Sequence, residues 1–358
     1  MNIILFIIIL SILVFVHELG HFLFAKMTNT KVHSFAIGFE PTLLKKKIGE
    51  TTYKLNLIPF GGYVRIHGQD GTEEITEDKH RAFLTKPVWA KLGILIGGIF
   101  FNVIFAWLLL SAALMAGTPS VVEPGSASEL TNVSTRILAV GPNSPIAQAG
   151  IEVGDEVVKI DHVGITHEEP NTKLLVDLLE ENPEAPFTFH FADKPAAVVT
   201  AEVPPGGSDP KLGLSIEAIG TKKLGFFPAL KEGFQDTRQM TQDTIAAFGS
   251  LITDAFRGSA DVSSLTGPVG LVGMVGDAAS YGISYLLFFT ALISINLAVL
   301  NLIPFPALDG GQILFVLIEA VIRRPINPKV ANIVNMLGFG ILILLMLAVT
   351  VFDVLKLI

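Results

Sequence analysis

The chain has 358 residues, of which 50% are hydrophobic and only 16% are charged, whereas a soluble globular chain carries about 25% charged residues. Its net charge of −8 disfavours nucleic-acid binding, which needs a basic face, and the absence of cysteine excludes disulfides, thiolate metal ligands and a cysteine nucleophile. The composition therefore predicts a membrane protein that binds no nucleic acid.

Four segments are apolar over the roughly 20 residues that are needed to cross a bilayer. They run from Asn2 to Ala25, Leu92 to Ala116, Ile283 to Ile303 and Ile333 to Phe352. The first lacks the basic start and the small-residue cleavage site of a secretory signal peptide. We therefore expect it to be retained as a membrane helix.

The charges between these segments predict an orientation. The loop from Lys26 to Lys91 holds 11 basic and 7 acidic residues, whereas the stretch from Gly117 to Gly282 holds 10 basic and 22 acidic residues. Short basic loops stay in the cytoplasm. We therefore expect both termini and the acidic stretch outside and the two shorter loops inside.

The acidic stretch has the pattern of a small domain followed by a helix. Short β-rich runs separated by turn clusters, with two short helical patterns between them, predict an α+β unit over residues 121–220. Apolar residues then recur among polar ones, which predicts an amphipathic linker helix over residues 226–258. Such a helix can lie on the membrane surface, cap a partner helix or form a solvated connector, and the sequence leaves these alternatives open.

The first inner loop is expected to form a β-hairpin. Thr51–Leu57 alternates as a strand, and Tyr63–Ile66 follows the turn residues 59–62. A hairpin at membrane depth needs protein or water to satisfy its backbone. The expected fold is therefore a polytopic α-helical membrane protein with four transmembrane helices, an inserted extracytoplasmic α+β domain and a membrane-associated β-hairpin.

The sequence His17-Glu18-Leu19-Gly20-His21 is an H-E-x-x-H motif inside the first apolar segment. Residues four apart lie on one face of a helix, so both imidazoles can bind one zinc ion with Glu18 beside them as general base. Ionisable side chains are costly in an apolar segment, and a metal cation compensates that cost. We therefore expect one Zn²⁺ per chain at His17 and His21.

A hydrolytic zinc site needs a third protein ligand and an open position for water. Asp309 is the preferred candidate, because it follows the third apolar segment after two prolines that stop the helix. Irregular backbone at membrane depth is tolerated where it lines a cavity. The alternative is that Asp309 caps a helix after the prolines.

Together these motifs resemble the site-2 protease family of intramembrane zinc metalloproteases. Residues 301–310 read N-x-x-P-x-P-x-x-D-G and follow the H-E-x-x-H motif in the order of that family. Residues 140–161 are similar to a bacterial PDZ domain. A PDZ domain between the second and third helices is the arrangement of the bacterial regulator-of-sigma-E protease branch, so residues 1–116 and 259–358 are expected to form the catalytic membrane part.

The resemblance implies a role for individual residues. It implies zinc ligands at His17, His21 and Asp309, the catalytic base at Glu18, and substrate contacts at Asn296 and Asn301. Residues 59–65 resemble the membrane-associated β-loop of the family. The edge formed by Gly62, Tyr63 and Val64 is therefore expected to pair with an unwound substrate by strand addition.

The chain departs from the family pattern in three places. It holds one PDZ-like domain where the best-known relatives have two in tandem. Ile160-Asp161-His162 stands where Ile-Asn-Gly is usual, and residues 97–102 lack a proline often found in the second helix. These departures concern how the outer domain screens substrates and leave the metal motifs intact.

The resulting hypothesis is regulated intramembrane proteolysis in a bacterial inner membrane. The substrate would be a single-pass membrane protein, already trimmed by another protease and cut within the bilayer toward the cytoplasmic side. Anti-sigma factors and remnant signal peptides are family precedents. The PDZ-like domain is expected to exclude untrimmed substrates by size, and the alternative is that it captures a new C-terminus.

Two other classes of protein compete with a protease. An inactive scaffold that binds helices would need neither Glu18 nor Asp309. An ion or zinc transporter would also hold buried polar residues. The large outer domain and the lack of repeated broken helices disfavour a transporter.

Overall fold

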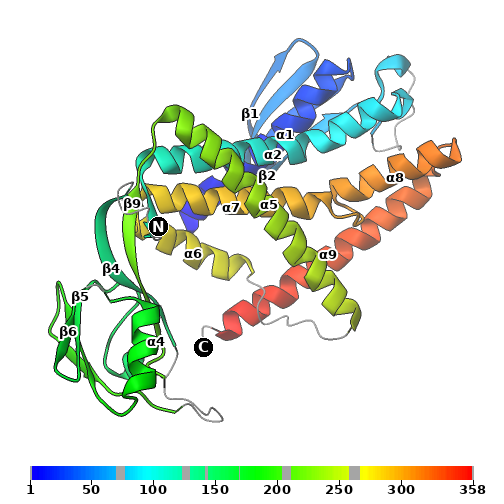
Figure 1. Cartoon of the computed structure of the whole chain (residues 1–358). Helices are drawn as coiled ribbons and strands as arrows, with labels where there is room; N and C mark the ends of the chain where they lie inside the picture. Colours follow the sequence, from blue (N-terminus) through cyan, green and yellow to red (C-terminus); the bar gives the residue numbers. More distant parts are fainter. Residues whose placement is uncertain are drawn as a thin grey trace. The chain divides into compact units, whose positions relative to one another are not determined.

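The computed structural model of the protein describes residues 2–69, 77–122, 130–141, 144–168, 170–203, 211–257 and 267–356. Contacts within the chain divide it into two units, which Figure 1 colours along the sequence. Unit 1 combines Met1–Ala113 with Phe226–Ile358, and unit 2 is the inserted stretch Leu114–Gly225. The expected inserted domain, residues 121–220, falls within unit 2.

Four helices of the described chain are long and apolar enough to cross a membrane. They are α1 (Asn2–Met27), α2 (Val88–Ala116), α7 (Ile283–Leu302) and α9 (Pro328–Lys356). Each contains most or all of one expected segment, because a long apolar run is the strongest helix signal in a membrane protein. The protein is therefore an integral membrane protein.

Small residues let α1 and α2 approach closely. A Cβ atom on Gly20 of α1 would overlap the main chain of Gly97 in α2, and one on Gly97 would lie 2.8 Å from the Gly20 carbonyl oxygen. Contacts between small residues are a common way to pack helices in membranes. The crossing brings the part of α1 that holds its two histidines against α2.

Three shorter or more polar helices complete unit 1: α5 (Phe226–Arg257), α6 (Pro268–Ser280) and α8 (Asp309–Ile322). The expected amphipathic helix is α5, and the end of its expected range, residue 258, lies outside the described residues. Met240 and Phe248 of α5 pack on a cluster from α2 and α7, and Trp107 Nε1 of α2 donates to the Leu230 carbonyl at 2.8 Å. Of the three alternatives, the structure therefore shows the one in which α5 caps partner helices.

The β-hairpin exists, but its expected turn is wrong. Strands β1 (Val32–Ile48) and β2 (Thr51–Ile66) turn at Gly49, whose φ of +60° suits glycine. The strands expected to pair with each other, 51–57 and 63–66, are instead the two ends of β2. Both ends pair with β1, and residues 34–37 lie between residues 52–55 and 62–65. The second half of β1 was not predicted, because three consecutive lysines, residues 45–47, break the apolar alternation of a strand.

An ion-pair cluster ties the turn of the hairpin to the end of α1. The Glu50 carboxylate accepts from Lys26 Nζ at 2.7 Å and from both terminal nitrogens of Arg81 at 2.7 Å. The hydrogen bonds from Arg81 and then Lys26 lower the pKa of Glu50 to about 2. The hairpin is thereby fixed beside α1, next to the two histidines.

Unit 2 is an α+β unit with two small sheets. Their strand orders are β3-β9-β4 and β6-β5-β7-β8. The core is apolar and includes the fully buried Ile137, Ile160, Phe187, Phe189 and Ile216. The strands are β3 (Thr118–Val121), β4 (Leu130–Val140), β5 (Val157–His162), β6 (Ile165–His167), β7 (Phe187–Phe191), β8 (Ala197–Val199) and β9 (Leu214–Lys222), and the helices are α3 (Pro145–Gln148) and α4 (Thr172–Glu181).

Candidate metal centre

Three side chains from α1 and α8 converge at one point. His17 Nε2 lies 3.0 Å and His21 Nε2 lies 3.3 Å from Asp309 Oδ2, and the two imidazole nitrogens are 3.1 Å apart. Both histidines are buried, and the Asp309 side chain is 15% exposed. The structure thus brings together the three residues that the sequence suggested as metal ligands.

These three atoms have the spacing and the chemistry of a zinc site. Ligand atoms about 2.0–2.1 Å from a tetrahedral zinc are about 3.3 Å from one another. Asp309 Oδ2 is buried and has no hydrogen-bond partner in the described part of the chain. A buried carboxylate oxygen is costly unless a hydrogen bond or a cation compensates it. The residues therefore fit a zinc ion.

A main-chain contact of His21 Nδ1 determines the tautomer of this imidazole. His21 Nδ1 lies 2.8 Å from the main-chain oxygen of Ile94 in α2. A carbonyl oxygen only accepts, so Nδ1 carries the proton and Nε2 of the neutral ring offers a lone pair. Metal-binding histidines are commonly oriented in this way.

The corresponding partner of His17 is Asn102, in the middle of α2. Asn102 Nδ2 lies 3.3 Å from His17 Nδ1, while the buried Oδ1 of the same amide has no partner among the described residues. A half-turn of the amide brings Oδ1 to Nδ1, where Oδ1 accepts a hydrogen bond from the Nδ1–H and leaves Nε2 free to bind a metal. In both histidines, Nδ1 then donates a hydrogen bond to an oxygen of α2 and Nε2 faces Asp309.

The segment that carries Asp309 is held by close backbone contacts. A Cβ atom on Gly310 would overlap the Ile303 carbonyl, and one on Gly311 would overlap the Phe305 carbonyl. The N–H of Ala307, whose φ is +74°, lies 3.3 Å from Asn335 Oδ1 of α9. The N-cap residue of α8 is Leu308, so Asp309 does not take the alternative role of capping residue.

A cavity of about 350 Å³ adjoins the three side chains. It is lined by Glu18 and by three of the expected substrate-binding residues, Tyr63, Val64 and Asn301. A Cβ atom on the fourth, Gly62, would lie 3.6 Å from Glu18 Cγ. The fifth, Asn296, is half-buried in α7 and does not line this cavity.

Two polar residues at the site were missed from the sequence. Gln69 lines the same cavity and donates to Gln312 of α8 at 3.0 Å. Asn102 orients His17, as described above. A lone asparagine in an apolar segment is a functional signal, so Asn102 could have been found, whereas nothing in the sequence indicates that Gln69 meets α8.

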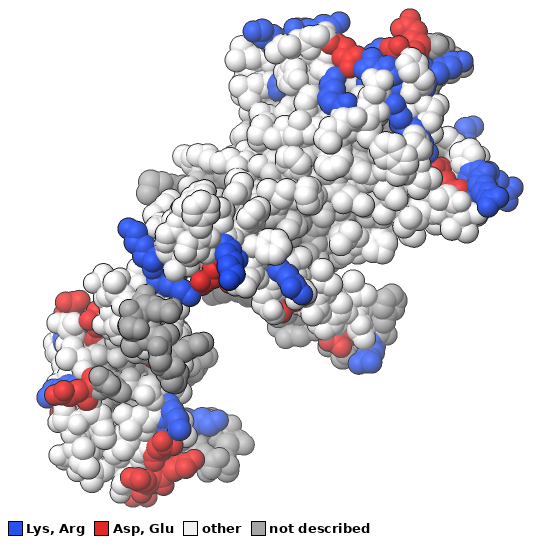
Figure 2. Space-filling view, turned by 45° about the horizontal axis from the view of Figure 1, so that its top comes forward, with Lys and Arg blue, Asp and Glu red and all other residues white. Residues whose placement is uncertain are grey.

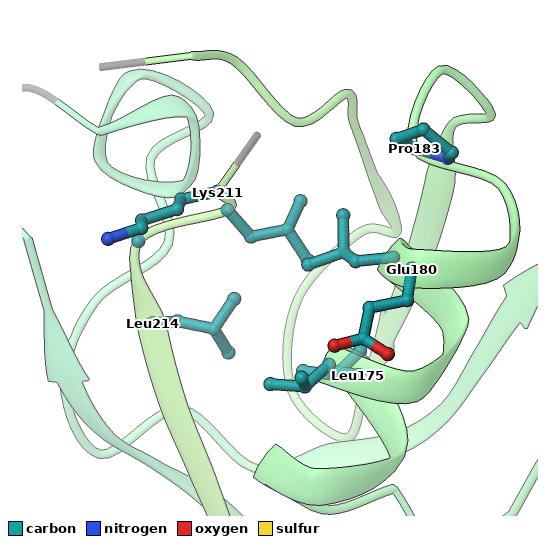
Figure 3. Close-up of a pocket in the computed structure, with 9 residues that line it drawn as sticks. Leu175, Glu180, Pro183, Lys211 and Leu214 are labelled. Carbon is teal, nitrogen blue, oxygen red and sulfur yellow. The ribbon is translucent and has the colours of Figure 1, made fainter. Parts of the chain in front are cut away.

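Unit 2 holds a separate groove of about 650 Å³ between α4 and the start of β9. Leu175 and Leu214 project into it, with Glu180 and Lys211 at its rim (Figure 3). The Thr172 hydroxyl donates to the Ile216 carbonyl at 2.8 Å and accepts from the Ile216 N–H at 2.9 Å. The main-chain groups of Ile216 on that edge of β9 are therefore already paired.

Comparison with known proteins agrees with this geometry. The model of peptidase family M50 matches residues 5–345. The chain is 35% identical over 347 residues to a protein of Clostridium perfringens named "Putative zinc metalloprotease", with 96% of each chain covered. It is 29% identical to the zinc metalloprotease RasP of Bacillus licheniformis, with 99% of each chain covered.

The match extends over nearly the whole chain, including both motifs that carry the three converging side chains. It confirms the prediction of a zinc metalloprotease of the site-2 protease type. The chain belongs to peptidase family M50.

Proposed function

We propose that the protein is an intramembrane protease that cuts transmembrane segments of single-pass membrane proteins. One zinc ion would be held by His17, His21 and Asp309. The observation that carries the proposal is the convergence of these side chains beside Glu18, within a helix that is apolar enough to cross a membrane. A catalytic centre at this depth has membrane-embedded peptide bonds within reach.

The zinc ion, when bound, polarises the scissile carbonyl and makes water a stronger acid. The Glu18 carboxylate faces the same cavity as the three ligands. Glu18 takes one proton from the attacking water and returns it to the leaving amine as the C–N bond breaks. Asn102 and the Ile94 carbonyl hold the two imidazoles in place throughout.

The substrate must unwind before it is cut, because an intact helix keeps its carbonyls in internal hydrogen bonds. Residues 62–64 of β2 have β1 as their strand neighbour in the described chain, and the Val64 main chain also hydrogen-bonds the Glu18 carboxylate. Tyr63 and Val64 of this strand line the cavity, and so does Asn301 of α7. The edge can hold an unwound substrate as an added strand, and the Asn301 amide can bind a freed main-chain group.

Unit 2 is proposed to be a PDZ-like domain that excludes untrimmed substrates by size. Strand addition to β9 needs free main-chain groups on its open edge. Thr172 occupies both groups of Ile216, so only Leu214, two residues earlier, is left to pair at the start of that edge. This contact favours size exclusion over capture of a C-terminal peptide.

The remaining parts of the proposal concern place and orientation. A bacterial inner membrane, unit 2 on the extracytoplasmic side and an active site toward the cytoplasm are supported by the charges of the loops. In this orientation, a substrate trimmed outside by another protease enters from the bilayer.

The position of the cut tests the proposal. Wild-type protein in lipid nanodiscs would be mixed with a trimmed single-span substrate, and the products sequenced by mass spectrometry. We expect cleavage within the apolar span, and no cleavage by the Glu18→Gln variant. Cleavage confined to the polar flanks, or equal cleavage by the variant, would contradict intramembrane proteolysis.

A further inference from the structure

A second apolar groove in unit 1 lies between α1 and the β-hairpin. It has a volume of about 700 Å³, within the range of ligand sites. Phe15, Leu19 and Phe22 of α1 form one wall, and the sheet of β1 and β2 forms the other. This groove is separate from the cavity beside His17 and His21.

The strand register explains the composition of the sheet wall. Ile37, Leu55 and Leu44 form one row across the strands, and Phe35, Tyr53 and Lys46 form the next row. Rows two residues apart point to the same face of a sheet, and all six residues line the groove. The wall is therefore apolar up to its outermost strand, where Lys46 stands at the edge.

The groove faces away from the metal centre. Leu19 is two residues from both His17 and His21, which places it about 200° around the helix from each of them. A peptide bond in this groove would therefore be on the wrong side of α1 to reach Glu18. The groove cannot serve as the substrate cleft.

Two wall residues expose large apolar side chains. Leu44 is 67% exposed and Leu55 is 43% exposed. Exposed leucines beside a helix that can cross a membrane indicate contact with lipid chains rather than with water. The apolar part of the groove is therefore suited to an acyl chain.

Three lysines line the groove, and two of them, Lys45 and Lys46, form no ion pair with a described carboxylate, whereas Lys54 pairs with Glu40. In unit 1, Lys26, Lys31, Lys54, Arg81 and Lys91 each pair with a carboxylate. Lys45 and Lys46, which line the groove, and the neighbouring Lys47 form no such pair with any described residue. Figure 2 shows a cluster of Lys and Arg side chains, with Asp and Glu side chains among them, on the face of the molecule that it draws.

We propose that this groove is a binding site for one anionic phospholipid. The acyl chain lies between α1 and the hairpin, and Lys46, supported by Lys45, binds the phosphate of the headgroup. The charge complementarity between two unpaired lysines and an anionic headgroup distinguishes this ligand from a neutral lipid. A bound lipid would brace β2, whose other end forms the edge beside Glu18.

Lipid binding can be measured without any protease activity. The full chain would be purified in detergent, and the affinities for phosphatidylglycerol and phosphatidylcholine measured by native mass spectrometry. We expect phosphatidylglycerol to bind more tightly, and Lys46→Gln to lower its affinity about fivefold, which corresponds to about 1 kcal/mol for one lysine near an anionic headgroup. Phosphatidylcholine affinity should not change.

Lys47→Gln is the matched control, because it removes the same charge from the same strand at a residue that does not line the groove. Leu44→Trp would fill the apolar part and should weaken both lipids. Equal losses from Lys46→Gln and Lys47→Gln would overturn the site in favour of diffuse attraction. Equal affinity of the wild type for the two lipids, or a peptide retained in the groove in place of lipid, would overturn the assignment to an anionic phospholipid.

Discussion

At the scale of single residues, the metal centre depends on a glycine that binds nothing. A Cβ atom on Gly98 of α2 would lie 2.5 Å from His21 Nε2 and 2.8 Å from His17 Cε1. Contacts this short cannot be accommodated without moving the imidazoles. The two histidines can face Asp309 only because α2 has no side chain at this position.

Gly98→Ala should therefore lower the zinc content of the purified protein well below that of the wild type. Gly93→Ala is the matched control on the same helix, because its Cβ would meet Phe24 at an ordinary 3.5 Å. Metal analysis and thermal unfolding of both variants measure the effect. Full zinc occupancy in Gly98→Ala would show that the histidines do not hold the metal in this arrangement.

Asn102 gives a second prediction at this scale. Asn102→Leu removes the acceptor for His17 Nδ1–H and should weaken zinc binding by about 10- to 100-fold, as is typical for partners of metal-binding histidines. Asn102→Asp keeps an acceptor and should bind zinc more tightly than Asn102→Leu by at least the same factor. Competition with a chelator measures both affinities, and identical values for the two variants would contradict the assigned role.

At the scale of elements, the turn of the hairpin is held by charge. Arg81 and Lys26 lower the pKa of Glu50 to about 2 from 4.5. A lowered carboxyl pKa means that the ion pairs stabilise the fold above about pH 4.5 and that this stability is lost as the pH falls toward 2. Because Glu50 is about one-third exposed, solvent screening reduces the effect.

Glu50→Gln should therefore destabilise the protein by about 1–2 kcal/mol at pH 7, with faster hydrogen exchange in β1 and β2. The difference from the wild type should shrink as the pH falls below about 4.5. Glu40→Gln is the control, since Glu40 is more exposed and lies 3.3 Å from Lys54. A difference that is constant between pH 7 and pH 3.5 would rule out the Glu50 ion pairs as its cause.

The elements also show which parts of the fold the sequence could predict. The membrane-spanning helices were found because an apolar run longer than about 18 residues is typical of a transmembrane helix and rare in soluble domains. Helices α6 and α8 were missed, since α6 is short and glycine-rich and α8 follows two prolines. The hairpin turn was misplaced because Gly61-Gly62 is a stronger turn signal than Gly49-Glu50, and only the pairing of β1 with both ends of β2 decides between them.

In the site, the sequence alone was enough to predict those residues whose type is rare in an apolar segment. His17, His21 and Asp309 belong to motifs whose ionisable side chains are costly in a membrane, so each of them indicates a functional role. Contacts made through the main chain, such as His21 with the Ile94 carbonyl, have no sequence signal. They follow from the crossing of α1 and α2, which is a property of the packed helices.

At the scale of the whole molecule, unit 2 can be removed without disturbing the metal motifs. The Leu224 N–H lies 3.0 Å from the Leu114 carbonyl, and Ser120 pairs with Gly220. The two ends of the unit are therefore adjacent, and a short Gly-Ser linker can replace residues 121–219. Zinc content should stay at the wild-type value, which serves as the control for folding.

This deletion should allow cleavage of substrates that still carry their outer portion, at a rate close to that of trimmed substrates. The wild type should cut the trimmed form at least tenfold faster than the untrimmed form. Gel-based cleavage of the two forms by both proteins measures the change. If the deletion variant loses cleavage of the trimmed form while keeping its zinc, unit 2 delivers substrates and does not exclude them.

The central claim is that Glu18 acts at a zinc ion held by His17, His21 and Asp309. Its most direct test compares the wild type with Glu18→Gln and Asp309→Ala, with zinc quantified and cleavage of one trimmed single-span substrate followed in each. We predict about one zinc per chain in the wild type and Glu18→Gln, and much less in Asp309→Ala. Cleavage by either variant should be slower than cleavage by the wild type by at least about 100-fold. Full zinc occupancy in Asp309→Ala, or wild-type cleavage by Glu18→Gln, would contradict the claim.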